Sequence, residues 1–162
     1  MKARIAKSLL LLPLLAVLST PLWAQGTAKF GYRGWGVRAG LSNNPDQVYG
    51  GVHWDLGEFA KNVRFRPNVE VGFGDNVNLI MGNAEVHYVF SQVQVWKPYV
   101  GGSTGFIYVN PDQGDSDTNL TLTGVGGVET KLKSGTAFFI EGKFGFTDNE
   151  PDFKAGVGWT WK

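Results

Sequence analysis

Apolar and polar residues alternate along this chain in one segment after another. Between residues 63 and 73, every second residue from Val63 to Phe73 is apolar, and the residues between them are charged, polar or glycine. Successive side chains on a β-strand point to opposite faces, so this segment predicts a strand with one apolar and one polar face. Because the pattern recurs along the chain with turn-forming residues between the repeats, we expect an all-β chain of eight strands.

Two kinds of connection separate the predicted strands. The strands span residues 35–41, 48–56, 63–73, 80–90, 96–108, 120–132, 138–146 and 153–161. The first strand can also extend back through Phe30 and Tyr32, with a bulge near Gly34. Loops 42–46, 75–78, 110–119 and 147–152 alternate with turns 57–62, 91–95 and 133–136. This order predicts an eight-stranded antiparallel up-and-down barrel with both chain ends on the side of the turns.

The two registers of the predicted strands differ sharply in chemistry. The polar register holds the ionisable residues Arg38, His53, Asp55, Arg64, Arg66, Glu70, Glu85, His87, Lys97, Glu129, Lys131, Glu141, Lys143 and Lys154. The apolar register holds the aromatic residues Trp35, Trp54, Phe65, Phe73, Tyr88, Phe90, Trp96, Phe106, Tyr108, Phe138, Phe144, Phe146, Phe153, Trp159 and Trp161. Which register faces inward decides the class of protein.

Volume favours an outward-facing apolar register. A soluble lipocalin-like barrel would turn the apolar register inward, whereas a transmembrane barrel turns it toward lipid. The interior of an eight-stranded barrel is only just wide enough for side chains, and the aromatic rings would overfill it. The polar register is rich in glycine, which leaves room for long charged side chains. Ten residues at about 3.3 Å each, tilted by about 45°, rise roughly 23 Å, close to the height of a lipid-facing band. The sequence therefore predicts a transmembrane β-barrel.

Residues 1–24 have the pattern of a cleavable signal peptide. Three basic residues precede an apolar core at residues 9–18, and Leu22-Trp23-Ala24 provides a cleavage site before Gln25. The core is too short to span a bilayer, which takes roughly 20 residues as a helix. We therefore expect a signal peptide at 1–24, a short segment at 25–34 and a barrel at 35–162. The expected location is the outer membrane of a Gram-negative bacterium.

Composition excludes several other classes. The chain has no cysteine, so it forms no disulfide and carries no lipid on an N-terminal cysteine. Residues 1–24 contain three of the 15 basic residues and no acidic residue, so the remainder has 12 basic against 14 acidic residues and a net charge of −2. With no basic excess, we expect no nucleic-acid partner.

Several short motifs carry a resemblance to a known family. The strand starts Phe65-Arg66-Pro67-Asn68-Val69 and Trp96-Lys97-Pro98-Tyr99-Val100, with the terminal Val157-Gly158-Trp159-Thr160-Trp161, are similar to the outer-membrane β-barrel domain family. This family holds opacity-type surface proteins and small barrels like the transmembrane domain of outer-membrane protein A. The resemblance covers roughly residues 30–162. It implies recognition of an aromatic strand end by the outer-membrane assembly machinery, although Lys162 follows Trp161 here.

The polar register is compatible with two kinds of lumen, one closed by side chains and one that conducts ions. Its seven basic and five acidic side chains would have to be paired or hydrated inside the barrel, and a salt-bridged plug is the expectation for a lumen this narrow. The alternative is a small ion-conducting pathway through the barrel. The connections on the side away from the chain ends carry the acidic residues Asp46, Asp75, Asp112, Asp115, Asp117, Asp148, Glu150 and Asp152. We expect these carboxylates to be solvated.

No catalytic constellation can be assembled from the sequence. Some eight-stranded barrels are lipid A-modifying enzymes that use a histidine, but His53 and His87 face the predicted lumen and have no serine beside them in a recognisable motif. We expect a non-enzymatic, monomeric envelope protein with no catalytic, cofactor-binding or metal site. Its expected partners are outer-membrane lipids, lipopolysaccharide and the assembly machinery. The alternatives are a soluble periplasmic carrier of an apolar ligand and a lipid A-modifying enzyme.

Overall fold

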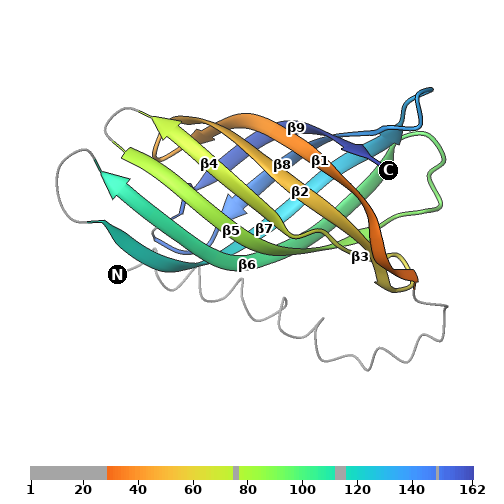
Figure 1. Cartoon of the computed structure of the whole chain (residues 1–162), viewed down its shortest axis with the longest axis horizontal. Coiled ribbons are helices and arrows are strands. Elements are labelled where there is room, and N and C mark those ends of the chain that lie inside the picture. The colour runs from red at the N-terminus through yellow and green to blue at the C-terminus, as the bar shows by residue number, and fades with distance from the viewer. Residues whose placement is uncertain (1–28, 75–76, 112–115, 149) are drawn as a thin grey trace, which may run out of the picture.

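All described residues belong to one antiparallel sheet and its connections. The computed structural model describes residues 29–74, 77–111, 116–148 and 150–162. The strands in these residues are β1 (Lys29–Asn43), β2 (Gln47–Ala60), β3 (Val63–Phe65), β4 (Asn68–Gly74), β5 (Val77–Val89), β6 (Lys97–Pro111), β7 (Asp117–Lys131), β8 (Ala137–Gly145) and β9 (Phe153–Trp161). They run obliquely around a common axis (Figure 1).

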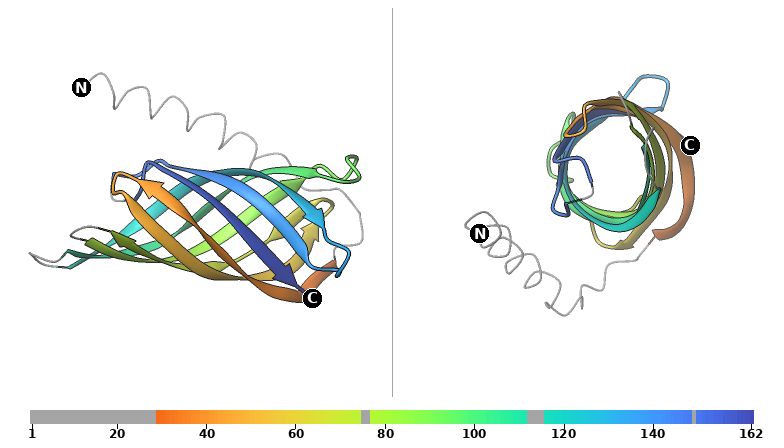
Figure 2. Two further views of the ribbon diagram at one scale, coloured as in Figure 1. Left: turned by 90° about the horizontal axis from the view of Figure 1, so that it is seen from above. Right: turned by 90° about the vertical axis from the view of Figure 1, so that its left-hand side faces the viewer.

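The sheet closes on itself. β1 pairs in antiparallel fashion with β2 on one side and with β9 on the other, and the end-on view in Figure 2 shows a closed ring. β3 and β4 form a single barrel strand because pairing continues across the break between them. The amide of Arg66 donates to the carbonyl of Glu85 at 2.8 Å, and the amide of Trp54 donates to the carbonyl of Pro67 at 2.9 Å. The predicted eight-stranded antiparallel barrel is thus confirmed.

The connections divide between the two ends of the barrel. Strands β1, β4, β6 and β8 end at one end of the barrel, here the loop end, and connections 61–62, 90–96 and 132–136 lie at the other, here the turn end. β1 begins at Lys29, so it includes residues that the sequence placed in a segment ahead of the barrel. Its pairing with β2 shifts between Phe30 and Gly34, at the expected bulge. The predicted signal peptide at 1–24 lies outside the described residues.

Side chains alternate between lumen and exterior as the strand geometry requires. Phe144 is 57% exposed and Trp54 is 37% exposed on the outer wall, whereas Glu70 and Lys143 are 1% and 2% exposed in the lumen. This is the reverse of the arrangement that a carrier of apolar ligands needs. Among the described residues, no helix is long and apolar enough to cross a membrane.

Candidate functional site

The centre of the lumen is filled by six charged side chains, three basic and three acidic. This central ion cluster consists of Arg38 (β1), Glu70 (β4), Glu85 (β5), Glu141 and Lys143 (β8), and Lys154 (β9). Each is buried, and each reaches the axis because inward positions recur at every second residue of its strand. Charges removed from water need partners of opposite sign, and equal numbers of the two signs meet that need.

Arg38 and Lys143 bridge the carboxylates of the central ion cluster. Nη1 of Arg38 lies 2.9 Å from Oε1 of Glu141 and 3.3 Å from Oε1 of Glu70, and its Nη2 lies 3.4 Å from Oε1 of Glu85. Nζ of Lys143 donates to Glu70 and Glu85, each at 2.8 Å. These contacts therefore tie β1, β4, β5 and β8 together across the lumen.

Lys154 completes the central ion cluster from the remaining side. Its ammonium donates to Oε2 of Glu70, lies 4.3 Å from the centre of the Tyr49 ring and is 3.7 Å from Sδ of Met81. Glu70 thus receives three cationic partners, from Arg38, Lys143 and Lys154. It is the carboxylate with the largest number of cations in the described lumen.

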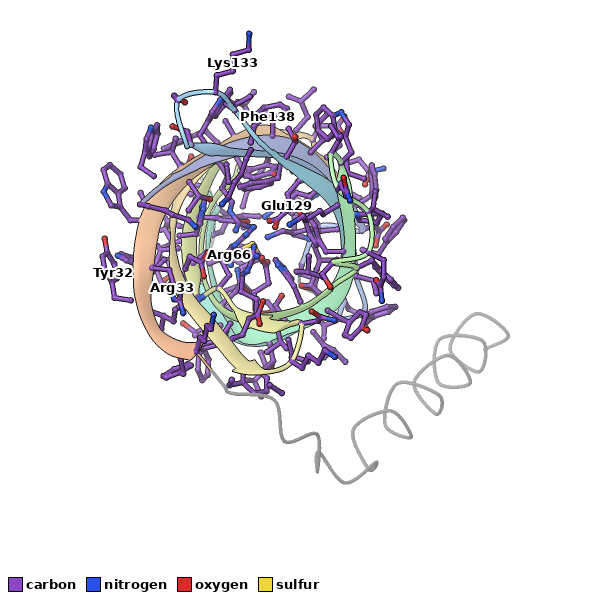
Figure 3. All side chains as sticks on the ribbon, turned by 90° about the vertical axis from the view of Figure 1, so that its right-hand side faces the viewer. Tyr32, Arg33, Arg66, Glu129, Lys133 and Phe138 are labelled. Carbon is purple, nitrogen blue, oxygen red and sulfur yellow. The ribbon has the colours of Figure 1, made fainter. Side chains whose placement is uncertain are left out.

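A second group of charges lies nearer the turn end. This mouth ion cluster consists of Asp55, Arg64, Arg66 and Glu129. Nη1 of Arg64 donates to both carboxylate oxygens of Glu129, at 2.9 and 2.7 Å, and Nη2 of Arg66 donates to Oε2 at 3.1 Å. Asp55 lies 3.9 Å from Nε of Arg64. Figure 3 shows Arg66 and Glu129 within the ring of strands and Tyr32 outside it.

The two histidines lie between these clusters and are fully buried. Nε2 of His53 lies 2.8 Å from Oγ1 of Thr160, and the ring meets the edge of Phe139. The ring of His87 stacks on Tyr99 with 4.7 Å between centroids, and its Nε2 lies 2.9 Å from Oε1 of Glu85. Neither imidazole is open to a substrate, since both have 0% exposure. Their contacts are those of structural side chains in a packed interior.

Besides the two histidines, two of the predicted lumen residues lie outside these clusters. Lys97 is half-buried at the start of β6, and Lys131 is exposed at the end of β7. Neither forms an ion pair within the part of the chain that the structure describes. The sequence predicted seven basic against five acidic side chains in one network. The structure instead pairs five with five and leaves these two lysines at the turn end, where the barrel opens and water can reach them.

The lumen also holds aromatic rings that the sequence analysis did not assign to it. Tyr49, Tyr99 and Phe139 are at most 3% exposed and point inward. Glycines on facing positions make the space: a Cβ at Gly158 would collide with the Phe139 ring, and one at Gly127 would lie 2.7 Å from Tyr99 Cζ. The hydroxyl of Tyr99 donates to Glu141 at 2.9 Å, which links the aromatic layer to the central ion cluster. The alternating phase puts these rings inside, whereas the sequence predicts a packed polar lumen.

The loop between β8 and β9 covers the loop end through Glu150, which the sequence placed among solvated carboxylates. Glu150 is 4% exposed. Its Oε1 accepts from the amides of Phe146 and Thr147, each at 2.9 Å, and its Oε2 accepts from the hydroxyl of Thr123 at 2.6 Å. These bonds hold the loop inward over the lumen. The expected acidic residues Asp75, Asp112 and Asp115 lie outside the described residues.

The space left in the lumen matches a closed barrel. A cavity at the loop end, beside Glu70, Lys154 and Glu150, measures about 10 Å³, too little for more than one water molecule. A cavity at the turn end measures about 770 Å³ and has Arg66 and Glu129 among its lining residues. The central ion cluster lies between the two cavities. In the described structure the packed side chains therefore separate the two ends of the barrel.

The aromatic residues assigned to the outer wall are all exposed or half-buried, and none is buried. Several contact one another along the wall. Trp35 lies against Trp161 with 5.3 Å between ring centres, Phe138 lies against Trp159 at 5.3 Å, and Phe144 lies against Phe153 at 4.9 Å. The first two pairs lie near the turn end and the third near the loop end. Aromatic girdles at two levels are typical of barrels that cross a membrane.

The fold is that of the small eight-stranded barrels found in outer membranes, and comparison with solved structures bears this out. The chain is similar to Neisserial surface protein A, with a TM-score of 0.64 and 15% identity over 82% of this chain and 99% of that one. It is similar to the N-terminal β-barrel domain of Pseudomonas aeruginosa OprF, with a TM-score of 0.55 and 13% identity over 80% of this chain and 97% of that one.

A third similar structure is described as an outer-membrane enzyme. This protein, PagL, has a TM-score of 0.51 and 13% identity over 80% of this chain and 99% of that one. No protein-family model and no curated protein matches the chain. At these identities the comparisons establish the fold alone, and the function must be argued from the lumen and the walls of this barrel.

Proposed function

We propose that this chain is an integral outer-membrane protein with a structural or surface-interaction role in the cell envelope and a closed polar lumen. The observation that carries the proposal is the division of side chains between the walls. Large apolar residues such as Phe106 and Phe144 are exposed on the outside, 62% and 57%, while charged residues fill the inside. Such a wall is stable against acyl chains and would aggregate in water. The turn end then faces the periplasm.

Membrane fractionation combined with a heat-shift gel tests this location. A folded transmembrane barrel resists detergent until it is boiled, so boiled and unboiled samples migrate differently. We expect a heat-shifted band in the outer-membrane fraction. A freely soluble periplasmic band without a shift would contradict the proposal and favour the carrier of an apolar ligand.

The closed lumen predicts a very small conductance. The central ion cluster occupies the axis, and opening a pathway would separate buried charges from their partners, which is costly. We expect planar-bilayer recordings to show no large steady current. A large and stable conductance of the wild-type protein would refute the plug.

We propose that the protein is not an enzyme, although PagL shares the fold. The support is the position of His53 and His87, both inside the lumen and fully buried. A base acting on lipid A must reach the lipid-facing side of the wall. Lipid A from cells with and without the protein should have the same structure. A protein-dependent loss of an acyl chain would overturn this proposal.

A further inference from the structure

The turn end of the barrel opens into a cavity with an unusual excess of positive charge. Its volume of about 770 Å³ lies within the range of sites for small ligands. The cavity is lined by the basic residues Lys29, Arg33, Lys61, Arg64, Arg66, Lys97, Lys131 and Lys162, against the acidic residues Asp55, Glu58 and Glu129. The basic side chains come from the starts of some strands and the ends of others, all at the turn end, and surround one space. The mouth ion cluster forms its floor.

The acidic residues of the cavity do not neutralise this charge. Glu129 is engaged by Arg64 and Arg66, and Asp55 lies beside Arg64. The remaining basic residues form no ion pair among the described residues; they are Lys29, Arg33, Lys61, Lys97, Lys131 and Lys162. Within the described residues, the guanidinium of Arg33 donates only to the backbone carbonyl of Lys29, at 3.1 Å. Six cations therefore share one concave space with one further carboxylate, that of Glu58.

The crowding of these cations affects the protonation of Lys162. The pKa of Lys162, which follows the last strand, is lowered mainly by the neighbouring ammonium of Lys131. A lysine whose charge is disfavoured by a neighbouring ammonium marks a region of positive potential. A multiply charged anion between the two ammonium groups would remove this repulsion.

We propose that the turn-end cavity binds an anionic phosphate group. Lysine ammonium groups act as point charges that suit phosphate oxygens, and a concave wall of low dielectric focuses their field on the space between them. The volume exceeds that of a single phosphate and fits an oligophosphate or the head group of an anionic phospholipid. A phospholipid head group can reach the cavity because this end of the barrel lies at the level of a membrane leaflet in the proposed orientation.

Titration calorimetry with tripolyphosphate in a neutral detergent tests the site without depending on membrane location. The test variant replaces three cavity lysines together: Lys97→Gln, Lys131→Gln and Lys162→Gln. The matched control is Lys133→Gln, since Lys133 lies at the same end but points away from the barrel (Figure 3). We expect wild type and control to bind, and the triple variant to bind about a hundredfold more weakly. A heat-shift gel verifies that the triple variant is folded.

A competition experiment separates the two sources of phosphate. Wild-type protein is placed in nanodiscs of phosphatidylcholine with or without added phosphatidylglycerol. If the head group is the occupant, phosphatidylglycerol abolishes tripolyphosphate binding, and the triple variant retains less of this lipid in native mass spectrometry. If a soluble oligophosphate is the occupant, binding persists in both nanodiscs.

Three results would overturn the proposal. The first is wild-type protein that binds neither tripolyphosphate nor phosphatidylglycerol. The second is a loss of affinity in the Lys133→Gln control equal to that in the triple variant. The third is binding of citrate as tight as that of tripolyphosphate, which would remove the assignment to phosphate.

Discussion

Replacing Glu70 by glutamine should destabilise the barrel strongly. The change keeps the shape of the side chain but removes one of three negative charges from the central ion cluster. Arg38 and Lys143 keep other carboxylate partners, Glu85 and Glu141, whereas Lys154 pairs with no other carboxylate in the described structure. Breaking a buried ion pair from one side costs about 3–5 kcal/mol, because the remaining charge stays out of water. We expect Glu70→Gln to lower the free energy of unfolding by this amount.

The assay is reversible urea unfolding of the folded barrel in lipid vesicles, followed by tryptophan fluorescence. Glu58→Gln is the matched control, since Glu58 lies at the turn end and forms no ion pair within the described residues; it should change the free energy of unfolding by less than about 0.5 kcal/mol. A double variant with Glu70→Gln and Lys154→Met removes both charges of the broken pair. It should recover a large part of the lost stability, because no unpaired ammonium then remains buried.

Two results would refute this reasoning. If Glu70→Gln costs less than about 1 kcal/mol, the cluster is hydrated like a surface ion pair rather than packed. If the double variant is no more stable than Glu70→Gln alone, the penalty does not arise from the unpaired Lys154.

Three further changes probe other parts of the account. Glu150→Ala removes the acceptor that holds the β8–β9 loop inward, so limited proteolysis should cut residues 146–152 faster than in wild type, and an unchanged rate would contradict the role of this carboxylate. Gly158→Leu overpacks the lumen and should cost about 1–3 kcal/mol in urea unfolding, whereas Gly82→Leu faces open space outside and should cost little; equal losses would refute the packing argument. Lys131→Gln should raise the pKa of Lys162, measured by NMR titration, because it removes the repelling ammonium. A lowered pKa of Lys162 would contradict the repulsion between the two lysines.

The two-residue alternation of side-chain direction along each strand explains how much of this barrel could be predicted from its sequence. Strand phase is a local property, so alternation alone assigned Arg38, Glu70 and Lys143 to one face and Phe144 to the other. The volume of an eight-stranded lumen then decided which face lies inside. The fold, the strand count and the closed sheet follow from these two arguments.

The details of the lumen depend on contacts between distant strands and could not be obtained in this way. The pairing of Arg38 with Glu141 joins residues of β1 and β8, and nothing in the local sequence specifies it. Glu150 lies in a loop, where no period fixes the direction of the side chain, so its inward turn depends on donors from β7 and the loop itself. Lys97 and Lys131 share the inward phase, but their position at strand ends places them beyond the packed region.

Oxygen accessibility along β6 tests the central claim, that the apolar register faces acyl chains, most directly. The chain has no cysteine, so single substitutions Ser103→Cys, Thr104→Cys, Phe106→Cys and Ile107→Cys can each carry one nitroxide label. Ser103 and Ile107 are buried, and Thr104 and Phe106 are exposed. In lipid vesicles we predict that oxygen, which concentrates among acyl chains, relaxes the labels at 104 and 106 strongly and those at 103 and 107 weakly. Stronger relaxation at 103 and 107 than at 104 and 106, or equal relaxation at all four positions, would contradict the account.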